Sequence, residues 1–159
     1  MTSLYSCLMF GEGKKDKKFL ITLIDLPKFK YHTSKWTIKI EGASGSSPEV
    51  ILRQCQAIPY FQNYNLVICF IDLDKLKNDY PQKWETKKKQ LEKNYSNITI
   101  IWQIDNAEDE YRKVLGAQYD NKHKLNKMAK KQVALFINSS LWKRILKPIR
   151  DTEKELNKL

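Results

Sequence analysis

The chain has 159 residues, with 29 lysines and arginines against 18 aspartates and glutamates, and a formal net charge of +11. This length is enough for one domain with its own hydrophobic core, and the positive field favours a polyanionic partner such as nucleic acid. No apolar run approaches the roughly 20 residues of a membrane-spanning helix, so we expect no such helix and no membrane partner.

The three cysteines, Cys7, Cys55 and Cys69, are widely spaced in apolar segments, without a CxxC pair and with only two histidines in the chain. This pattern predicts reduced thiols in the core rather than a disulfide framework or a zinc site. The first residues lack the charged-then-apolar pattern of a signal peptide. We therefore expect a cytoplasmic protein.

The first third of the chain predicts two strands with a helix between them. Residues 3–10 form a short apolar run before a glycine, which is typical of a strand buried on both faces. Residues 14–26 have apolar side chains at helical spacing and end at Pro27. Residues 35–40 alternate apolar and polar side chains, which predicts a half-buried outer strand.

The middle of the chain predicts a second helix and a central strand. Ser47 and Pro48 are typical of the N-cap and first position of a helix, and residues 50–57 continue it. Residues 66–71 are the most hydrophobic stretch in the chain and predict a central strand that ends at Asp72.

The remaining elements complete an α/β pattern. Residues 84–95 predict a lysine-rich amphipathic helix and residues 97–103 a fourth strand. Four strands alternating with three helices predict a four-stranded, mainly parallel sheet flanked by helices. After it come only helical patterns, at residues 107–115, 122–138 and 141–156. We expect an α/β domain over 1–105 and a helical C-terminal extension over 106–159, packed on it; a semi-independent helical arm is the alternative.

Three carboxylates follow predicted strands: Glu12, Asp72 and Asp74. Functional groups of open α/β sheets gather at the carboxyl ends of the strands, so these residues are expected to converge. In an extended segment Asp72 and Asp74 would face the same way and hold one hard cation through oxygen ligands. The alternatives are a solvated polar strand end and an ordinary turn glutamate.

Two segments carry a resemblance to a known family: LMFGEGKKD at residues 8–16 and VICFIDLD at residues 67–74. In order, spacing and strand context they are similar to the E-G-x-x-D and DxD motifs of the Toprim domain of topoisomerases, primases and old-type nucleases. The resemblance covers roughly residues 3 to 105. It implies a Rossmann-like Toprim fold and a small Toprim-like nuclease of the old or defence-associated type.

The resemblance also implies roles for single residues. Glu12 would be the general acid/base or a metal-coupled carboxylate, while Asp72 and Asp74 would bind Mg²⁺, with Mn²⁺ as an alternative. Asp16 matches the family's second acidic position, although it also suits the first turn of a helix. Many family members have a glycine or a further acidic residue soon after the second aspartate, whereas Lys75 follows Asp74 here. This difference leaves the number of bound metals open.

Two further groups of residues are expected to contact phosphates. Ser44, Gly45 and Ser46 lie before a predicted helix and form a candidate phosphate loop, with a plain connector as the alternative. The expected nucleic-acid contacts are basic: Lys14, Lys124, Lys127, Lys130, Lys131 and Arg144. Trp142 is a candidate stacking platform beside them, and a solvated basic face is the alternative interpretation.

These features predict a magnesium-dependent nuclease that acts on DNA or RNA and belongs to a phage-defence or mobile-element system. The alternative is a non-catalytic nucleic-acid or nucleotide-binding subunit that docks an ATPase partner. The presence of Glu12 favours catalysis, because a scaffold that only binds does not need an acid/base group at that position.

Overall fold

The computed structural model describes residues 4–43, 47–103, 111–112, 114–115, 122–137 and 139–157. The side chains of residues 14–16, 122, 123 and 126 lie outside this description. Within these ranges no helix is long and apolar enough to cross a membrane.

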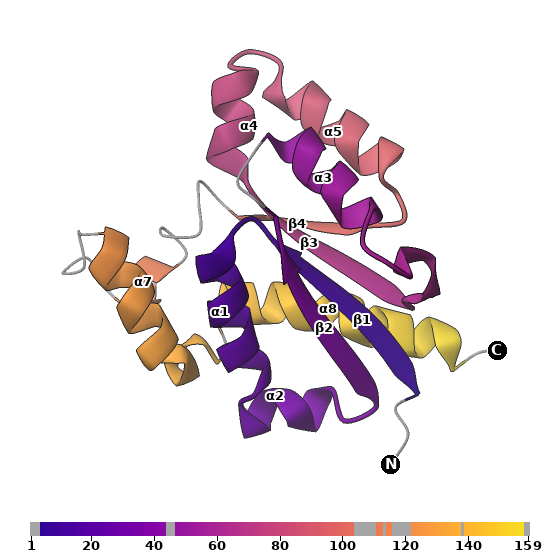
Figure 1. Cartoon of the computed structure of the whole chain (residues 1–159), viewed down its shortest axis with the longest axis vertical. Helices are drawn as coiled ribbons and strands as arrows, with labels where there is room; N and C mark the ends of the chain where they lie inside the picture. The colour runs from indigo at the N-terminus through magenta and orange to yellow at the C-terminus, as the bar shows by residue number, and fades with distance from the viewer. Residues whose placement is uncertain are drawn as a thin grey trace.

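The core of the protein is a four-stranded sheet in which every neighbouring pair of strands is parallel (Figure 1). The strands are β1 (Tyr5–Gly11), β2 (Trp36–Gly42), β3 (Leu66–Asp72) and β4 (Thr99–Gln103). Their order across the sheet is β2-β1-β3-β4. The predicted α/β fold is confirmed, and its sheet is parallel throughout.

Burial of the strands follows their place in the sheet. In β1, Cys7 and Met9 point into the core on one face, while Leu8 and Phe10 point into the core on the other. Parallel central strands are covered on both faces, which explains their continuous apolar sequence. In β2, Trp36 and Ile40 are buried whereas Thr37 and Lys39 are exposed, as predicted for an outer strand.

Helices cover both faces of the sheet (Figure 1). On one face lie α1 (Lys14–Ile24), α2 (Pro27–His32), α7 (Lys122–Lys131), the 3-10 helix Val133–Phe136 and α8 (Ser140–Leu156). On the other face lie α3 (Pro48–Gln56), the 3-10 helix Phe61–Asn63, α4 (Leu73–Asp79) and α5 (Trp84–Asn94). The result is a three-layer arrangement with two separate apolar cores.

The C-terminal helix α8 belongs to the core of the sheet. Four of its side chains are buried, Leu141, Trp142, Ile145 and Ile149, and they share one cluster with residues of β1 and β3. The side-chain oxygen of Ser139 accepts a hydrogen bond from the Trp142 backbone N–H at 3.2 Å and caps the start of the helix.

Two helices were not predicted. The first helix was expected to stop at Pro27, but this residue begins a second helix, α2. Its missing backbone N–H costs nothing at the first helical position, and Phe29 anchors α2 in the core. Helix α4 follows β3 without a loop and buries Leu73 and Leu76. The helix predicted over 122–138 divides into α7 and the 3-10 helix Val133–Phe136. Of the helix predicted over 107–115, the described residues 111–112 and 114–115 are helical.

Candidate functional site

The candidate site lies where the direction of the chain across the sheet reverses. From β1 the chain moves to β2 on one side, and β3 lies on the other side of β1. In open parallel sheets, ligands bind at the carboxyl ends of the strands beside such a switch point. Glu12 directly follows β1, and Asp72 is the last residue of β3.

Glu12 reaches across from β1 to the end of β3. Its Oε2 accepts a hydrogen bond from the backbone N–H of Asp72 at 3.3 Å, and its Oε1 lies 3.9 Å from the Nζ of Lys75. Only 14% of the side chain is exposed. The structure therefore brings together two of the predicted site residues that are 60 positions apart in the sequence.

Asp74 is placed differently from the prediction. Asp72 is extended, with φ −71° and ψ 125°, but α4 begins at Leu73, so Asp74 lies in the first helical turn. The expectation that Asp72 and Asp74 lie in one extended segment is wrong. The physical reason is the burial of Leu73 and Leu76 three positions apart, which favours a helix, and an acid in its first turn is also favourable. Asp72 and Asp74 are both half-buried.

The acidic residues at this edge are of the type that binds Mg²⁺, but the structure limits how many of them could bind one ion. Carboxylate oxygens are the ligands that Mg²⁺ prefers. Among the side chains that the structure describes, no three acidic, histidine or cysteine residues are grouped so that they could hold one ion. Mg²⁺ commonly keeps several waters and uses only one or two carboxylates together with substrate phosphates. Asp72 and Asp74 supply two carboxylates at the end of β3 and the start of α4, and the Glu12 carboxylate bonds to the backbone of Asp72.

Lys75 is a site residue to which the sequence pattern assigned no role. Its ammonium group lies near the Glu12 carboxylate, and its side chain is 39% exposed. It balances part of the negative charge of Glu12 and stands within reach of solvent. In the sequence, the signal for Lys75 was that the residues after Asp74 depart from the Toprim pattern.

Cys69 lies three residues before Asp72 and is fully buried. Its pKa is raised well above the usual range, first by a hydrogen bond with Cys55, then by burial and by the negative charges of Cys55 and Glu12. Burial also raises the pKa of Cys7. All three cysteines are buried and free, which places them in the core as predicted.

Several predicted residues cannot be placed in the site. The side chains of Lys14 and Asp16 and the loop residues Ser44, Gly45 and Ser46 lie outside the described residues. Their roles stay predictions.

The predicted basic helix is present as α7. Lys124, Lys127, Lys130 and Lys131 are all exposed, whereas Leu125 and Ala129 are buried. Helix α7 packs against α1, the helix that follows Glu12 (Figure 1). The lysines therefore lie on the same face of the sheet as α1, and their contact with nucleic acid stays a prediction.

Two other residues of the predicted nucleic-acid surface lie on α8. Arg144 is half-buried and donates from Nη1 to the backbone oxygen of Trp102 at 2.8 Å, so it also holds β4. Trp142 is only 3% exposed and its ring packs edge-on against Phe29, with centroids 5.3 Å apart. The idea that Trp142 stacks on bases is wrong, because its ring is part of the core.

Comparisons with known proteins identify no family for this chain. No protein-family model matches the chain, and no curated protein matches it either. Among solved structures, the chain is similar to the C-terminal region of the OLD protein of Xanthomonas campestris pv. campestris. The TM-score is 0.34 and the identity 11%, over 87% of this chain and 81% of that chain. A similarity of this size leaves the function to be argued from the site itself.

Proposed function

We propose that the protein is a metal-dependent phosphodiesterase acting on nucleic acid, a small Toprim-like nuclease. The observation that carries the proposal is the hydrogen bond at 3.3 Å from the Asp72 backbone to the Glu12 carboxylate. It joins acidic residues from two neighbouring strand ends at the switch point of a parallel sheet, where ligands of such sheets bind.

In this proposal each acidic residue has a separate task. Asp72 and Asp74 hold Mg²⁺, which when bound polarises a phosphodiester and stabilises charge on its oxygens. Glu12 is positioned by the Asp72 N–H, and it acts either as general base that takes a proton from the attacking water or as general acid that gives a proton to the leaving oxygen. The Lys75 ammonium group lies 3.9 Å from the Glu12 carboxylate and can turn to a phosphate oxygen when substrate binds.

Substrate binding must overcome repulsion between the phosphate backbone and these acids. The net charge of +11 supplies a general attraction, and α7 offers the exposed lysines Lys127, Lys130 and Lys131. Because α7 packs against α1, we expect the strand to enter the site over these two helices.

One observation favours a second function. Lys75 already neutralises part of the Glu12 charge with its ammonium group at 3.9 Å, which lowers the need for a cation at this position. A non-catalytic nucleic-acid or nucleotide-binding subunit, working with an ATPase partner, would keep this pair without cleaving anything.

Incubation of the full chain with labelled single- and double-stranded DNA and RNA, in Mg²⁺, Mn²⁺ or chelator, separates the two functions. We expect cleavage that the chelator abolishes. Asp72→Asn and Asp74→Asn should each reduce the rate on the order of 10²-fold or more, since a bound metal supplies several kcal/mol of transition-state stabilisation.

Asp79→Asn is the matched control, because Asp79 is the exposed last residue of α4 and should leave the rate unchanged. Wild-type protein that binds the oligonucleotides but cuts none of them in either metal would favour the binding subunit. Full activity in both aspartate variants would remove the assigned metal site.

A further inference from the structure

The outer edge of β4 is open in the described parts of the chain. Among the described strands, β4 pairs only with β3, on its inner side. The Trp102 carbonyl oxygen accepts a hydrogen bond from Arg144 of α8, so this carbonyl points away from β3. Backbone groups alternate along a strand with a period of two, so the N–H and C=O of Ile100 also face outward. No other described backbone group pairs with them.

The two edges of the sheet differ in their protection against pairing. β2, at the opposite edge, carries Lys39 and Glu41, which take part in salt bridges. Charged side chains on an edge strand are a common defence against pairing with another chain. β4 has the sequence Thr-Ile-Ile-Trp-Gln and no charge at all. Its edge is therefore suited to accept a further strand.

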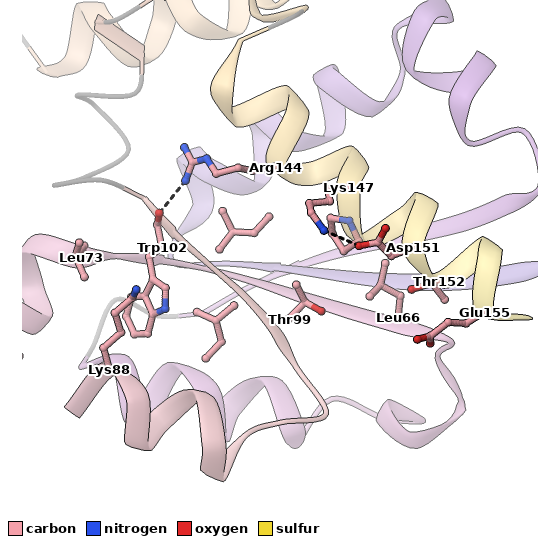
Figure 2. Close-up of a pocket in the computed structure, with 13 residues that line it drawn as sticks. Leu66, Leu73, Lys88, Thr99, Trp102, Arg144, Lys147, Asp151, Thr152 and Glu155 are labelled. Atoms are coloured by element: carbon pink, nitrogen blue, oxygen red, sulfur yellow. Dashed lines mark hydrogen bonds and ion pairs between the residues drawn. The ribbon is translucent and has the colours of Figure 1, made fainter. Parts of the chain in front are cut away.

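A groove of about 600 Å³ follows this edge between α8 and α5 (Figure 2). Its floor is formed by β4, with Ile100 and Trp102 among its lining residues. One wall comes from α8, through Pro148 and Thr152, and Lys88 of α5 stands on the other side. The space gives a strand access to the outward backbone groups.

Charge is distributed unevenly along the groove. Arg144 and Lys88 lie near Trp102, at the carboxyl end of β4, whereas Asp151 and Glu155 lie toward Leu66 at its amino end (Figure 2). Arg144 and Glu155 are eleven positions apart, roughly 16 Å along a helix, which matches the roughly 16 Å length of a five-residue strand. Lys147 also lines the groove and pairs with Asp151 at 2.8 Å, so Glu155 gives that end its net negative charge, whereas the end with Arg144 and Lys88 is positive.

We propose that this edge pairs with a second copy of the chain, β4 against β4 in antiparallel orientation. A two-fold axis perpendicular to the sheet makes identical edge strands antiparallel and keeps α8 of both copies on the same face. The basic end of each groove then meets the acidic end of the other. The four-stranded sheet becomes a continuous sheet of eight strands with both β4 edges covered.

Charge reversal at Asp151 tests the pairing in the full chain. Asp151 is exposed and bonds to Lys147 within α8 at 2.8 Å. Wild-type protein should show a concentration-dependent dimer in sedimentation equilibrium. Asp151→Lys makes the acidic end basic and should raise the dimer dissociation constant about tenfold or more, since like charges would face each other across the interface.

Adding Lys147→Glu to Asp151→Lys should restore the dimer. The double variant exchanges the two charges, so the net charge of this end of the groove returns to its wild-type value, and the ion pair within α8 keeps a favourable orientation with the acid first. Asp25→Lys is the control: Asp25 is also exposed and pairs with a lysine, Lys30, at 2.9 Å, but it lies outside the groove. It makes the same change in net charge and should leave the dimer intact.

Hydrogen exchange at the Ile100 amide identifies the strand pairing itself. In the dimer this amide should exchange at least about tenfold more slowly than in the Asp151→Lys monomer. A chain that stays monomeric at its highest soluble concentration overturns the proposal, as does a dimer with an unprotected Ile100 amide. Equal effects of Asp25→Lys and Asp151→Lys overturn it as well. Protection of Ile100 in a monomer only after an oligonucleotide is added would assign the groove to nucleic acid instead.

Discussion

At the scale of single residues, Glu12 combines a structural contact with a proposed chemical task. Its carboxylate is mostly buried and has two partners, the Asp72 N–H and the Lys75 ammonium. The first contact needs only an acceptor oxygen, whereas proton transfer needs an ionisable group. A substitution by the amide separates these two requirements.

Glu12→Gln should therefore reduce cleavage on the order of 10²- to 10⁴-fold, the usual contribution of a general acid or base. Its amide oxygen can still accept from Asp72, and we expect the free energy of unfolding to change by less than about 1 kcal/mol. Single-turnover cleavage and urea unfolding measure the two effects. A variant that loses stability and activity together would make Glu12 a structural residue.

At the scale of elements, α7 is the part of the structure best suited to hold a polyanion near the acids. Its lysines are exposed and its apolar side chains anchor it beside α1. Each phosphate neutralised by such a lysine releases condensed counterions, so the affinity falls with salt.

Replacing Lys127, Lys130 and Lys131 by glutamine should flatten the plot of log affinity against log salt by roughly 0.7 to 0.9 unit for each phosphate that the protein no longer neutralises. Fluorescence anisotropy with a labelled oligonucleotide over a salt series measures the slope. The matched control replaces three exposed lysines around α5 on the other face of the sheet: Lys83, Lys89 and Lys93. If both triple variants behave alike, the basic helix has no specific part in binding.

The elements also show what the sequence could and could not predict. The apolar runs of β1 and β3 and the alternation in β2 were sufficient to predict the sheet, and topology then implied that Glu12 and Asp72 meet. Helices α2 and α4 have six and seven residues and few apolar positions. They exist because Phe29 and Leu76 are buried by distant elements, which no local pattern shows. Because α4 begins at Leu73, Asp74 lies in the first turn of this helix.

At the scale of the whole molecule, polar contacts tie the end of α8 to the opposite edge of the sheet. Glu153 Oε1 accepts from the Trp36 indole N–H at 2.8 Å, and Glu153 Oε2 bonds to Arg150 at 3.0 Å. A nitrogen of Arg150 lies 2.7 Å from Nδ1 of His32. This cluster fixes α8 against α2 and β2, so the helical segment and the sheet share one framework. The proposed division between residues 105 and 106 stays a prediction.

Glu153→Ala should lower the free energy of unfolding by about 1 to 3 kcal/mol, because Trp36 and Arg150 would lose an acceptor in a partly buried position. Urea denaturation followed by tryptophan fluorescence measures the change. Lys154→Ala, at the exposed neighbouring position, should stay within about 0.5 kcal/mol of the wild type. An equal loss in both variants would show that the cluster contributes nothing of its own.

The two apolar cores differ in how much of the chain must be synthesised before each can form. The buried cluster that contains Leu8 and Phe10 draws its members from residues 8–98, whereas the cluster on the other face needs side chains as late as Ile149. During translation one face of the sheet can therefore be covered while the other still exposes Cys7, Met9 and Ile68 to the ribosome exit and to chaperones. Emergence of α8 from the ribosome therefore sets the moment at which the nascent chain can bury this remaining apolar surface.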